Sequence, residues 1–453
     1  MSSQRRYTVV DLFCGCGGLT RGLERTGRFV SRLGVDINAT ALATFKANHG
    51  HGYPPATWQG DIRELNTSDI FALLKIEPNS TSDGIDLLVG GPPCEGFSRN
   101  KTYTSEDVAN VKILDPRAVR QIKYSEEKYW SSAWSGAVCK SSRRLRAYNP
   151  FLADPRNFLF RDFLRVATAL RPKAIIIENV RQILEHNDGA IAEELLSWFS
   201  DNGYRAEARV INAAEYGVPQ QRLRAFFLAL RNDVASSAAL PWPQATHSAS
   251  EYVSLREAIS DLPPPTPKTK VDDISRLPLD CYAERPTTAF QRFVRIGVSG
   301  PANHIYRTPS EQVLKKIRAM KPGMRPHHLP KELQPKKYYY NSYGRLEWDK
   351  PANTITKSFL YPGSGRFCHP VEDRVISYRE AARLQSFDDD FTFVASSQEG
   401  LAHMIGSAVP PLLGYRFGIE MATLLDTVSA ANIDARAEAT PKRPRRTQKR
   451  RIA

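Results

Sequence analysis

The chain has 453 residues, of which 41% are hydrophobic and 25% are charged, a composition that suits a soluble globular protein and excludes a mainly disordered one. No apolar run approaches the ~18 residues that a membrane span needs, which excludes a transmembrane class. The formal net charge is +15, from 63 Lys and Arg against 48 Asp and Glu, and this favours polyanionic partners, nucleic acid first.

The first 230 residues alternate short apolar, β-rich runs with amphipathic segments. The runs predicted as strands are Thr8–Phe13, Val30–Asp36, Ile85–Val89, Ala174–Glu178, Arg205–Asn212 and Ala225–Leu230. The segments predicted as helices are Leu19–Arg25, Thr40–Asn48, Phe158–Leu170 and Ile191–Asn202. This alternation predicts an α/β fold with a mostly parallel sheet, helices on both faces and ligands at the carboxyl ends of the strands.

The rest of the chain has a different texture. Residues 232–344 are rich in prolines and mixed aromatic and basic residues, which predicts a smaller, irregular, β-containing module. Residues 345–430 form a closing segment in which a helical pattern returns from Tyr378, and we expect this segment to dock back on the first domain, residues 1–231. Residues 431–453 end in a basic tail, which we expect to be disordered or to contact phosphates.

An insert, residues 99–153, lies between the third predicted strand and the helix at Phe158. It carries eleven Lys and Arg against five Asp and Glu, with six Tyr and Trp interleaved. Such a mixture suits contact with nucleic acid, whereas the plainer alternative is a surface hairpin.

Six cysteines in a chain of this length make no disulfide framework, and Cys14 and Cys16 are too close in sequence for a zinc pair. We therefore expect reduced thiols, no metal and a cytoplasmic protein.

A glycine-rich turn follows the first predicted strand in Asp11-Leu-Phe-Cys-Gly-Cys-Gly-Gly18. It lacks the Gly-Lys-Ser/Thr of a phosphate-binding loop, which argues against a triphosphate ligand. Asp36 ends the second strand, where dinucleotide folds grip a ribose, and Asp61 stands where a third strand would end. Either Asp alone could be a turn former; together with the glycines, they indicate S-adenosylmethionine.

Cys94 stands on a stiff elbow, Gly90-Gly-Pro-Pro-Cys-Glu-Gly-Phe-Ser98, directly after a predicted strand. A free cysteine is usually a small buried hydrophobe. The glycines and prolines instead place this one at the ligand edge of the sheet, as a nucleophile would be placed.

Two further motifs carry charged groups next to predicted strands. Glu178 ends the apolar run Ala174-Ile-Ile-Ile-Glu-Asn-Val180, where partial desolvation suits a group that holds or donates a proton. In Val218-Pro-Gln-Gln-Arg-Leu-Arg224, strand alternation puts Arg222 and Arg224 on one face. The plainer alternatives are a helix-capping acid and two solvent-facing arginines.

Taken in order, these motifs resemble those of the DNA (cytosine-5) methyltransferases of the bacterial restriction-modification type. The resemblance rests on DLFCGCGG, GGPPCEGFS, IIIENV and PQQRLR, and continues in RLEWDKPANTIT, SYREAARLQSFDDDF and MIGSAVPPLLG. It implies an S-adenosylmethionine-dependent, Rossmann-like methyltransferase fold in which residues 232–344 are the target-recognition domain.

By this resemblance, the Cys94 thiolate attacks C6 of a cytosine flipped out of double-stranded DNA, and Glu178 interacts with N3 and N4. Arg222 binds the base carbonyl or fixes Glu178, and Arg224 supports it. The cofactor residues that the motifs imply are Phe13, Gly15, Cys16, Gly17, Gly18, Asp36, Ile37, Asp61, Ile62, Pro92, Leu159, Ser407, Ala408 and Val409.

Two departures from the family pattern stand out. Ser407 replaces the usual amide of the closing motif, which puts one cofactor-side hydrogen bond in doubt. The insert 99–153 is longer than the usual segment after the nucleophile.

Two other functions remain open at this point: an RNA (tRNA) cytosine-5 methyltransferase of the same family, and a catalytically silent DNA-binding regulator. The length of residues 232–344 favours DNA over RNA, and the intact Cys94, Glu178, Arg222 and Arg224 favour an enzyme. We expect a monomer; the sequence leaves open whether a cognate restriction endonuclease is a partner.

Overall fold

The computed structural model describes residues 5–50, 52–77, 84–93, 155–185, 189–234, 239–268, 281–282, 284–335 and 341–439. Cys94, the insert 99–153 and the end of the basic tail lie outside the described residues. Within the described ranges, no helix is both long enough and apolar enough to span a bilayer.

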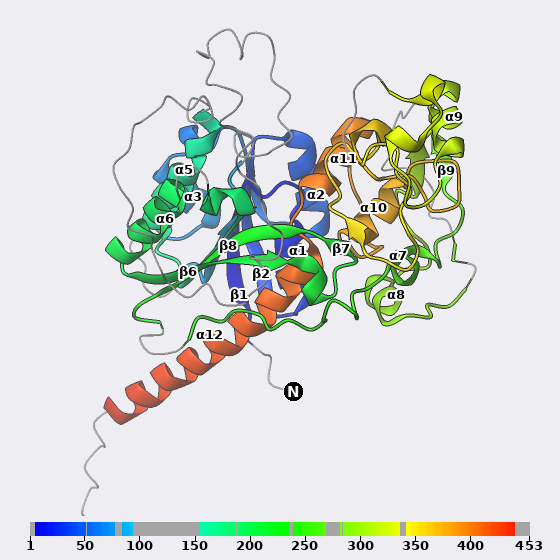
Figure 1. Cartoon of the computed structure of the whole chain (residues 1–453). Coiled ribbons are helices and arrows are strands. Elements are labelled where there is room, and N and C mark those ends of the chain that lie inside the picture. Colours follow the sequence, from blue (N-terminus) through cyan, green and yellow to red (C-terminus); the bar gives the residue numbers. More distant parts are fainter. Residues whose placement is uncertain are drawn as a thin grey trace, which may run out of the picture.

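A mostly parallel sheet forms the centre of the larger part of the molecule (Figure 1). Its seven strands lie in the order β3-β2-β1-β4-β5-β8-β6, and β8 runs antiparallel to both of its neighbours. The strands are β1 (Tyr7–Leu12), β2 (Phe29–Asp36), β3 (Ala56–Gln59), β4 (Leu87–Gly90), β5 (Ala174–Val180), β6 (Tyr204–Asn212) and β8 (Leu223–Arg231). The strand order reverses between β1 and β4, and sheets of this kind bind ligands beyond the carboxyl ends at that point.

Helices cover both faces of this sheet, which confirms the predicted α/β class. On one face, α1 (Gly18–Arg25) and α12 (Pro411–Ala439) share a core with β1, β4, β5 and β8. On the other face pack α3 (Thr67–Leu74), α5 (Leu159–Leu170) and α6 (Ala190–Asp201). The inner strands β4 and β5 carry continuous apolar runs, Leu87–Val89 and Ala174–Ile177, because both of their faces are buried.

The apolar runs located the long elements to within about two residues. Of two short elements, β3 was expected only as a strand ending near Asp61, without bounds, and α3 was not predicted. Strand β3 has the sequence Ala-Thr-Trp-Gln and lies at the sheet edge, where its residues are only half-buried or exposed. Helix α3 buries Ile70 and Leu74 in the core, and Phe71 and Leu73 pack against it half-buried. Strand β3 has only two apolar residues, and the five of α3 follow one another without a polar break, so neither segment shows a period.

The closing helix α12 lies directly against α1, through glycines on both helices. A Cβ on Gly22 would come 1.9 Å from the carbonyl oxygen of Pro411, and one on Gly414 would come 2.4 Å from that of Leu19. Larger residues would therefore force the two helices apart. This contact brings the C-terminal part of the chain to the helix that follows the glycine-rich turn.

Helix α12 also corrects the predicted start of the basic tail. Residues 431–439, expected as the beginning of a disordered tail, continue α12 as far as Ala439. Their sequence, Ala-Asn-Ile-Asp-Ala-Arg-Ala-Glu-Ala, is rich in strong helix formers, which favours continuation of the helix.

A smaller part of the molecule lies beside the sheet domain, on the right in Figure 1. Its elements are short: α7 (Leu255–Ile259), β9 (Thr266–Lys268), α8 (Ala289–Val294), β10 (Ile305–Arg307), α9 (Glu311–Ala319), β11 (Ala352–Asn353), α10 (Tyr378–Leu384) and α11 (Gln398–Ser407). One hydrophobic core joins α7, α8 and β10 to α10 and α11. The core thus runs across position 344, between the predicted recognition domain and the closing segment.

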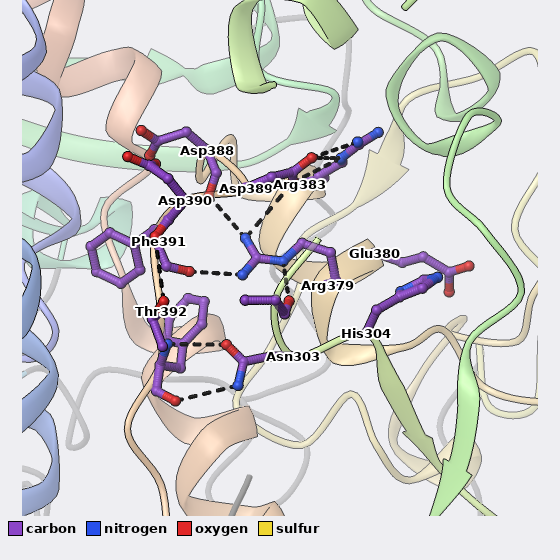
Figure 2. A network of polar contacts seen from close by, with 12 residues as sticks. Asn303, His304, Arg379, Glu380, Arg383, Asp388, Asp389, Asp390, Phe391 and Thr392 are labelled. Atoms are coloured by element: carbon purple, nitrogen blue, oxygen red, sulfur yellow. Dashed lines mark hydrogen bonds and ion pairs between the residues drawn. The ribbon is translucent and has the colours of Figure 1, made fainter. Parts of the chain in front are cut away.

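Buried arginines fasten these two segments together (Figure 2). The Arg379 guanidinium donates to the carbonyl oxygens of Ala302 (2.6 Å), Asp388 (2.9 Å) and Phe391 (2.7 Å). Arg383 forms ion pairs with Asp389 and Asp261. Removing either guanidinium would leave buried acceptors without donors, so these contacts hold the two segments together.

Candidate active site

The glycine-rich turn follows β1 and is bound to the end of β2. Phe13, Gly15 and Gly17 have φ values of 57°, 54° and 86°, in the left-handed region. The strained Phe13 is held because the Asp36 carboxylate accepts a hydrogen bond from the Gly15 N–H at 2.8 Å. The turn is therefore fixed in shape before any ligand arrives.

Asp36 and Asp61 both cap turns at the ligand edge. The Asp36 carboxylate also accepts from the Asn38 N–H at 2.8 Å, and burial raises the pKa of this carboxyl. Asp61 accepts from the Arg63 N–H at 3.1 Å, and the hydrogen bond from the Arg63 side chain lowers the pKa of Asp61. Both residues therefore form turns, as the plainer alternative predicted. Both carboxylates nevertheless remain at the carboxyl edge of the sheet.

The space around the turn suits a nucleoside-like ligand. A Cβ on Gly15 would meet no atom within 4 Å, so a ligand can approach the backbone there. Ile37, next to Asp36, is 68% exposed although it is apolar, and Phe13 and Leu159 are half-buried. Apolar side chains beside carboxylates offer a surface for a flat base and acceptors for hydroxyl groups.

The remaining predicted cofactor residues are either buried or lie where the closing motif meets the turn. Cys16, Ile62 and Pro92 are buried, and the Cys16 thiol donates to the Met404 carbonyl at 3.8 Å, so its side chain faces the core. A Cβ on Gly18 would come 2.2 Å from the carbonyl oxygen of Val409, which places the closing motif against the turn. In that motif, Ala408 and Val409 are half-buried and Ser407 is exposed.

The elbow that leads to Cys94 begins between the turn and Glu178. Gly90 in β4 pairs with Leu12 of β1 on one side and with Ile177 of β5 on the other. A Cβ on Gly91 would lie 3.4 Å from Glu178 Oε2. The Asn179 side chain donates to the Pro92 carbonyl at 3.2 Å. The elbow is therefore tied to the end of β5, up to the residues just before Cys94.

Glu178 is 8% exposed, and its side chain pairs with Arg224, whose Nε lies 3.0 Å from Glu178 Oε1. Arg224 stands opposite Val180 in the antiparallel pairing of β5 and β8. The carboxylate thus has a fixed orientation at the sheet edge, because a guanidinium holds one oxygen while the other faces the elbow at Gly91.

Arg222 has different partners from those predicted. It is 2% exposed, and its guanidinium donates to the carbonyl oxygens of Ile355 (3.1 Å), Gly406 (3.3 Å) and Ala408 (3.1 Å). The resemblance implied that Arg222 binds the base carbonyl or fixes Glu178, with Arg224 in support; in the structure the contact with Glu178 is made by Arg224, and binding of a base by Arg222 stays a prediction. Burial alternates as expected, with Leu223 exposed between the two arginines; the partners differ because segments far along the chain fold over Arg222.

Two glutamines, missed by sequence reasoning, complete this support. The Gln385 amide donates to the Ile405 carbonyl at 2.7 Å. The Gln220 amide donates to Gln385 Oε1 at 2.9 Å and accepts from the Ile355 N–H at 2.7 Å. Both belong to quoted motifs, so their positions were visible, but an uncharged polar residue gave no signal of burial. Together with Arg222 they hold the closing motif in place.

The comparisons decide the family. The family model of C-5 cytosine-specific DNA methylases matches residues 7–109 and 148–422. The chain belongs to this family. The match omits residues 110–147, which lie within the predicted insert.

The similarity to named relatives extends over nearly the whole chain. The type II methyltransferase M.DdeI of Desulfomicrobium norvegicum is 29% identical over 448 residues, covering 94% of this chain and 90% of its own. The type II methyltransferase M1.HphI of Haemophilus parahaemolyticus is 27% identical and covers 90% of this chain and 84% of its own. Among solved structures, a protein from E. coli described as a putative prophage-encoded DNA modification methyltransferase superposes with a TM-score of 0.61 at 20% identity, covering 93% of this chain and 99% of its own. That likeness shows the fold.

For this DNA methylase, Arg222→Met should lower the free energy of unfolding by about 3 kcal/mol, because three carbonyl oxygens lose the guanidinium donor and two of them keep only a long contact of 3.5 Å with the Gln385 amide. It should also weaken cofactor binding, since two of those carbonyls belong to the closing motif beside the turn. Urea unfolding and calorimetric titration with S-adenosylhomocysteine measure the two effects. The matched control is Arg161→Met, an exposed pair with Glu194, for which less than about 1 kcal/mol is expected. Equal losses in the two variants would contradict the role given to Arg222.

A second prediction concerns Asp11, buried beneath the turn. Burial raises the pKa of Asp11 from 3.8 to about 7, although a hydrogen bond from Thr20 Oγ1 (2.5 Å) opposes the shift. The folded state therefore binds the proton more tightly than the unfolded state, and this contribution to stability is lost as the pH rises from about 4 to about 7. Asp11→Asn should flatten that part of the pH profile of unfolding free energy. An unchanged slope in the variant would show that other groups produce it.

Proposed function

We propose that the enzyme transfers a methyl group from S-adenosylmethionine to C5 of a cytosine in a specific sequence of double-stranded DNA, through a covalent bond between Cys94 and C6. The observation that carries the proposal is the meeting of three motifs at one edge of the sheet. The elbow before Cys94 begins between the glycine-rich turn and the Glu178–Arg224 pair, so nucleophile, cofactor site and acid would face one reacting base.

The residues have distinct roles in this proposal. The cofactor supplies an electrophilic methyl group, and its site is formed by the turn Phe13–Gly18, by Asp36 and Ile37, and by Ala408 and Val409. The Cys94 thiolate adds to C6 while Glu178 supports protonation of N3, which makes C5 nucleophilic. After methylation, loss of the C5 proton and elimination of the thiolate restore the aromatic ring. Arg224 keeps Glu178 oriented throughout.

Cytosine must leave the duplex stack for this chemistry, which costs a few kcal/mol. We assign the choice of sequence to residues 232–344 and contact with DNA phosphates to the insert 99–153, whose predicted position follows the nucleophile. The basic tail would add phosphate contacts without sequence preference. The proposal includes action as a monomer in the cytoplasm, on the DNA of the nucleoid, with a cognate restriction endonuclease as a partner that a search of the neighbouring genes would reveal.

The deciding experiment is transfer of a labelled methyl group from S-adenosylmethionine to duplex DNA and, in parallel, to tRNA. We expect labelling of DNA alone, at C5 of cytosine within one recognition sequence. Labelling of tRNA instead would establish the RNA alternative, and binding of DNA without labelling of either substrate would establish the silent regulator. The named type II relatives favour the DNA substrate.

A further inference from the structure

A buried ion pair, Glu24 with His49, lies under the glycine-rich turn and has no part in the chemistry proposed above. Glu24 is on α1, and His49 follows α2 (Ala39–Asn48). His49 Nδ1 lies 2.8 Å from Glu24 Oε2, and both side chains are shielded from solvent. Burying two ionisable groups is costly unless they are fully hydrogen-bonded.

Glu24 is held as a carboxylate by three donors. Burial by itself would raise the pKa of Glu24, but the hydrogen bond and charge of His49 and the N–H groups of Ser31 and Gly50 lower it overall. Both N–H groups donate to Glu24 Oε1, each at 3.0 Å. The acid is thus anchored to β2 and to the chain after α2, and it holds the imidazole in one orientation.

The second ring nitrogen of His49 points at the turn. His49 Nε2 lies 3.3 Å from the carbonyl oxygen of Cys16. Both ring nitrogens therefore face acceptors, so a ring with a proton on each nitrogen satisfies both contacts. The rings of Phe45 at 4.4 Å and Phe391 at 6.1 Å, centroid to centroid, enclose the imidazole.

The imidazole also explains one glycine of the turn. Gly17 has a φ of 86°, and a Cβ there would come 2.2 Å from His49 Nε2. The peptide between Cys16 and Gly17 is bound at both ends, because its carbonyl faces His49 and its N–H donates to the Cys14 carbonyl at 2.8 Å. The ring therefore fixes the plane of the peptide at the centre of the turn.

We propose that His49, oriented by Glu24, is a positioning residue for the cofactor turn: its Nε2–H holds the Cys16 carbonyl and so presets the backbone that receives the adenosine part of the cofactor. The inference rests on the proposed use of S-adenosylmethionine. It predicts that losing this one hydrogen bond weakens cofactor binding about tenfold while turnover at saturating cofactor stays the same, because His49 does not reach the reacting atoms.

Two near-isosteric variants separate the two contacts of the ring. His49→Gln can place an amide N–H where Nε2 stands and keep the contact with Cys16. His49→Asn can place one where Nδ1 stands and keep only the contact with Glu24. We expect calorimetric titration with S-adenosylhomocysteine to give a dissociation constant within about twofold of wild type for Gln and about tenfold higher for Asn. The same split should appear in the KM for the cofactor, with kcat unchanged.

The outcomes are distinguishable from those of the proposed function. Equal dissociation constants for the two variants, whatever their size, would overturn the role of His49. A wild-type enzyme that binds no S-adenosylhomocysteine and methylates no DNA would instead overturn the proposed function. If His49→Asn does not fold, His49→Phe makes the same comparison with His49→Gln, because it keeps the ring contact with Phe45 and gives up both hydrogen bonds. Near-UV circular dichroism of each variant establishes that it is folded.

Discussion

Replacing Cys94 with alanine is expected to reduce methyl transfer to DNA by on the order of a thousandfold or more, because C6 then has no nucleophile to activate C5. Binding of S-adenosylhomocysteine should stay close to wild type, since Cys94 belongs to the elbow and not to the glycine-rich turn. Labelled methyl transfer and calorimetric titration measure the two quantities. Cys281→Ala, at an exposed cysteine of the smaller part, is the matched control and should leave both unchanged.

A covalent adduct that cannot be resolved provides a second, independent test of Cys94. When 5-fluorocytosine replaces the target base, the fluorine cannot leave as a proton does, so the wild-type enzyme should remain bound to the DNA through Cys94. A denaturing gel detects this species as a protein band of reduced mobility that requires the cofactor. Cys94→Ala should give no such band. A variant that retains more than a few percent of normal turnover, or still forms the adduct, would remove Cys94 from the mechanism.

The sequence was sufficient for the parts of this site that depend on strand ends. Apolar runs locate β1, β4 and β5, and the residues that follow such runs, Asp11-to-Gly18, Gly90-to-Pro93 and Glu178, have to meet at one edge of a parallel sheet. The hydrophobic period and the order of these segments along the chain are enough to predict that these residues meet. The same reasoning expected a third strand ending near Asp61 but gave β3 no bounds, because its four residues have no apolar period.

The roles of the two arginines show where such reasoning stops. Alternation put Arg222 and Arg224 on one face, and burial follows it, but alternation does not say what covers each side chain. Arg222 is covered by Ile355, Gly406 and Ala408, which are more than a hundred residues away in sequence. Arg224, two residues further on, stands opposite β5 and reaches Glu178.

Buried polar groups were the least predictable from the sequence. Glu24 and His49 lie in segments read only as the end of a helix and as a loop, and Arg379 and Arg383 belong to a helix whose charges suggest a solvent-facing side. In each case the partner is a backbone group or an acid brought in by tertiary folding, such as the Cys16 carbonyl for His49 and the Ala302 carbonyl for Arg379. The burial of a charged residue can therefore be predicted only once its partner is known.

Glu178→Gln is expected to lower kcat by about a hundredfold or more while sparing DNA affinity, because the amide keeps the shape of the side chain but cannot support a proton at N3. Single-turnover labelling measures the chemical step, and a gel-shift titration measures binding. Arg209→Met, at an exposed arginine on β6 that pairs with Glu207, is the control and should leave both unchanged. Normal turnover in Glu178→Gln would return this residue to the role of a helix-capping acid.

The Glu178–Arg224 pair allows a sharper test of the proposed task of Arg224, which is to orient Glu178 through the contact of its Nε with Glu178 Oε1 at 3.0 Å. Arg224→Met should then slow the chemical step in the wild-type background but add nothing once Glu178 is Gln, since an arginine that acts through a carboxylate has no further effect when the carboxylate is gone. The single variants and the double variant form a double-mutant cycle, and we expect the double variant to match Glu178→Gln within about twofold. Effects that multiply would mean that Arg224 acts independently of Glu178, as it would if it bound the base carbonyl or a phosphate directly.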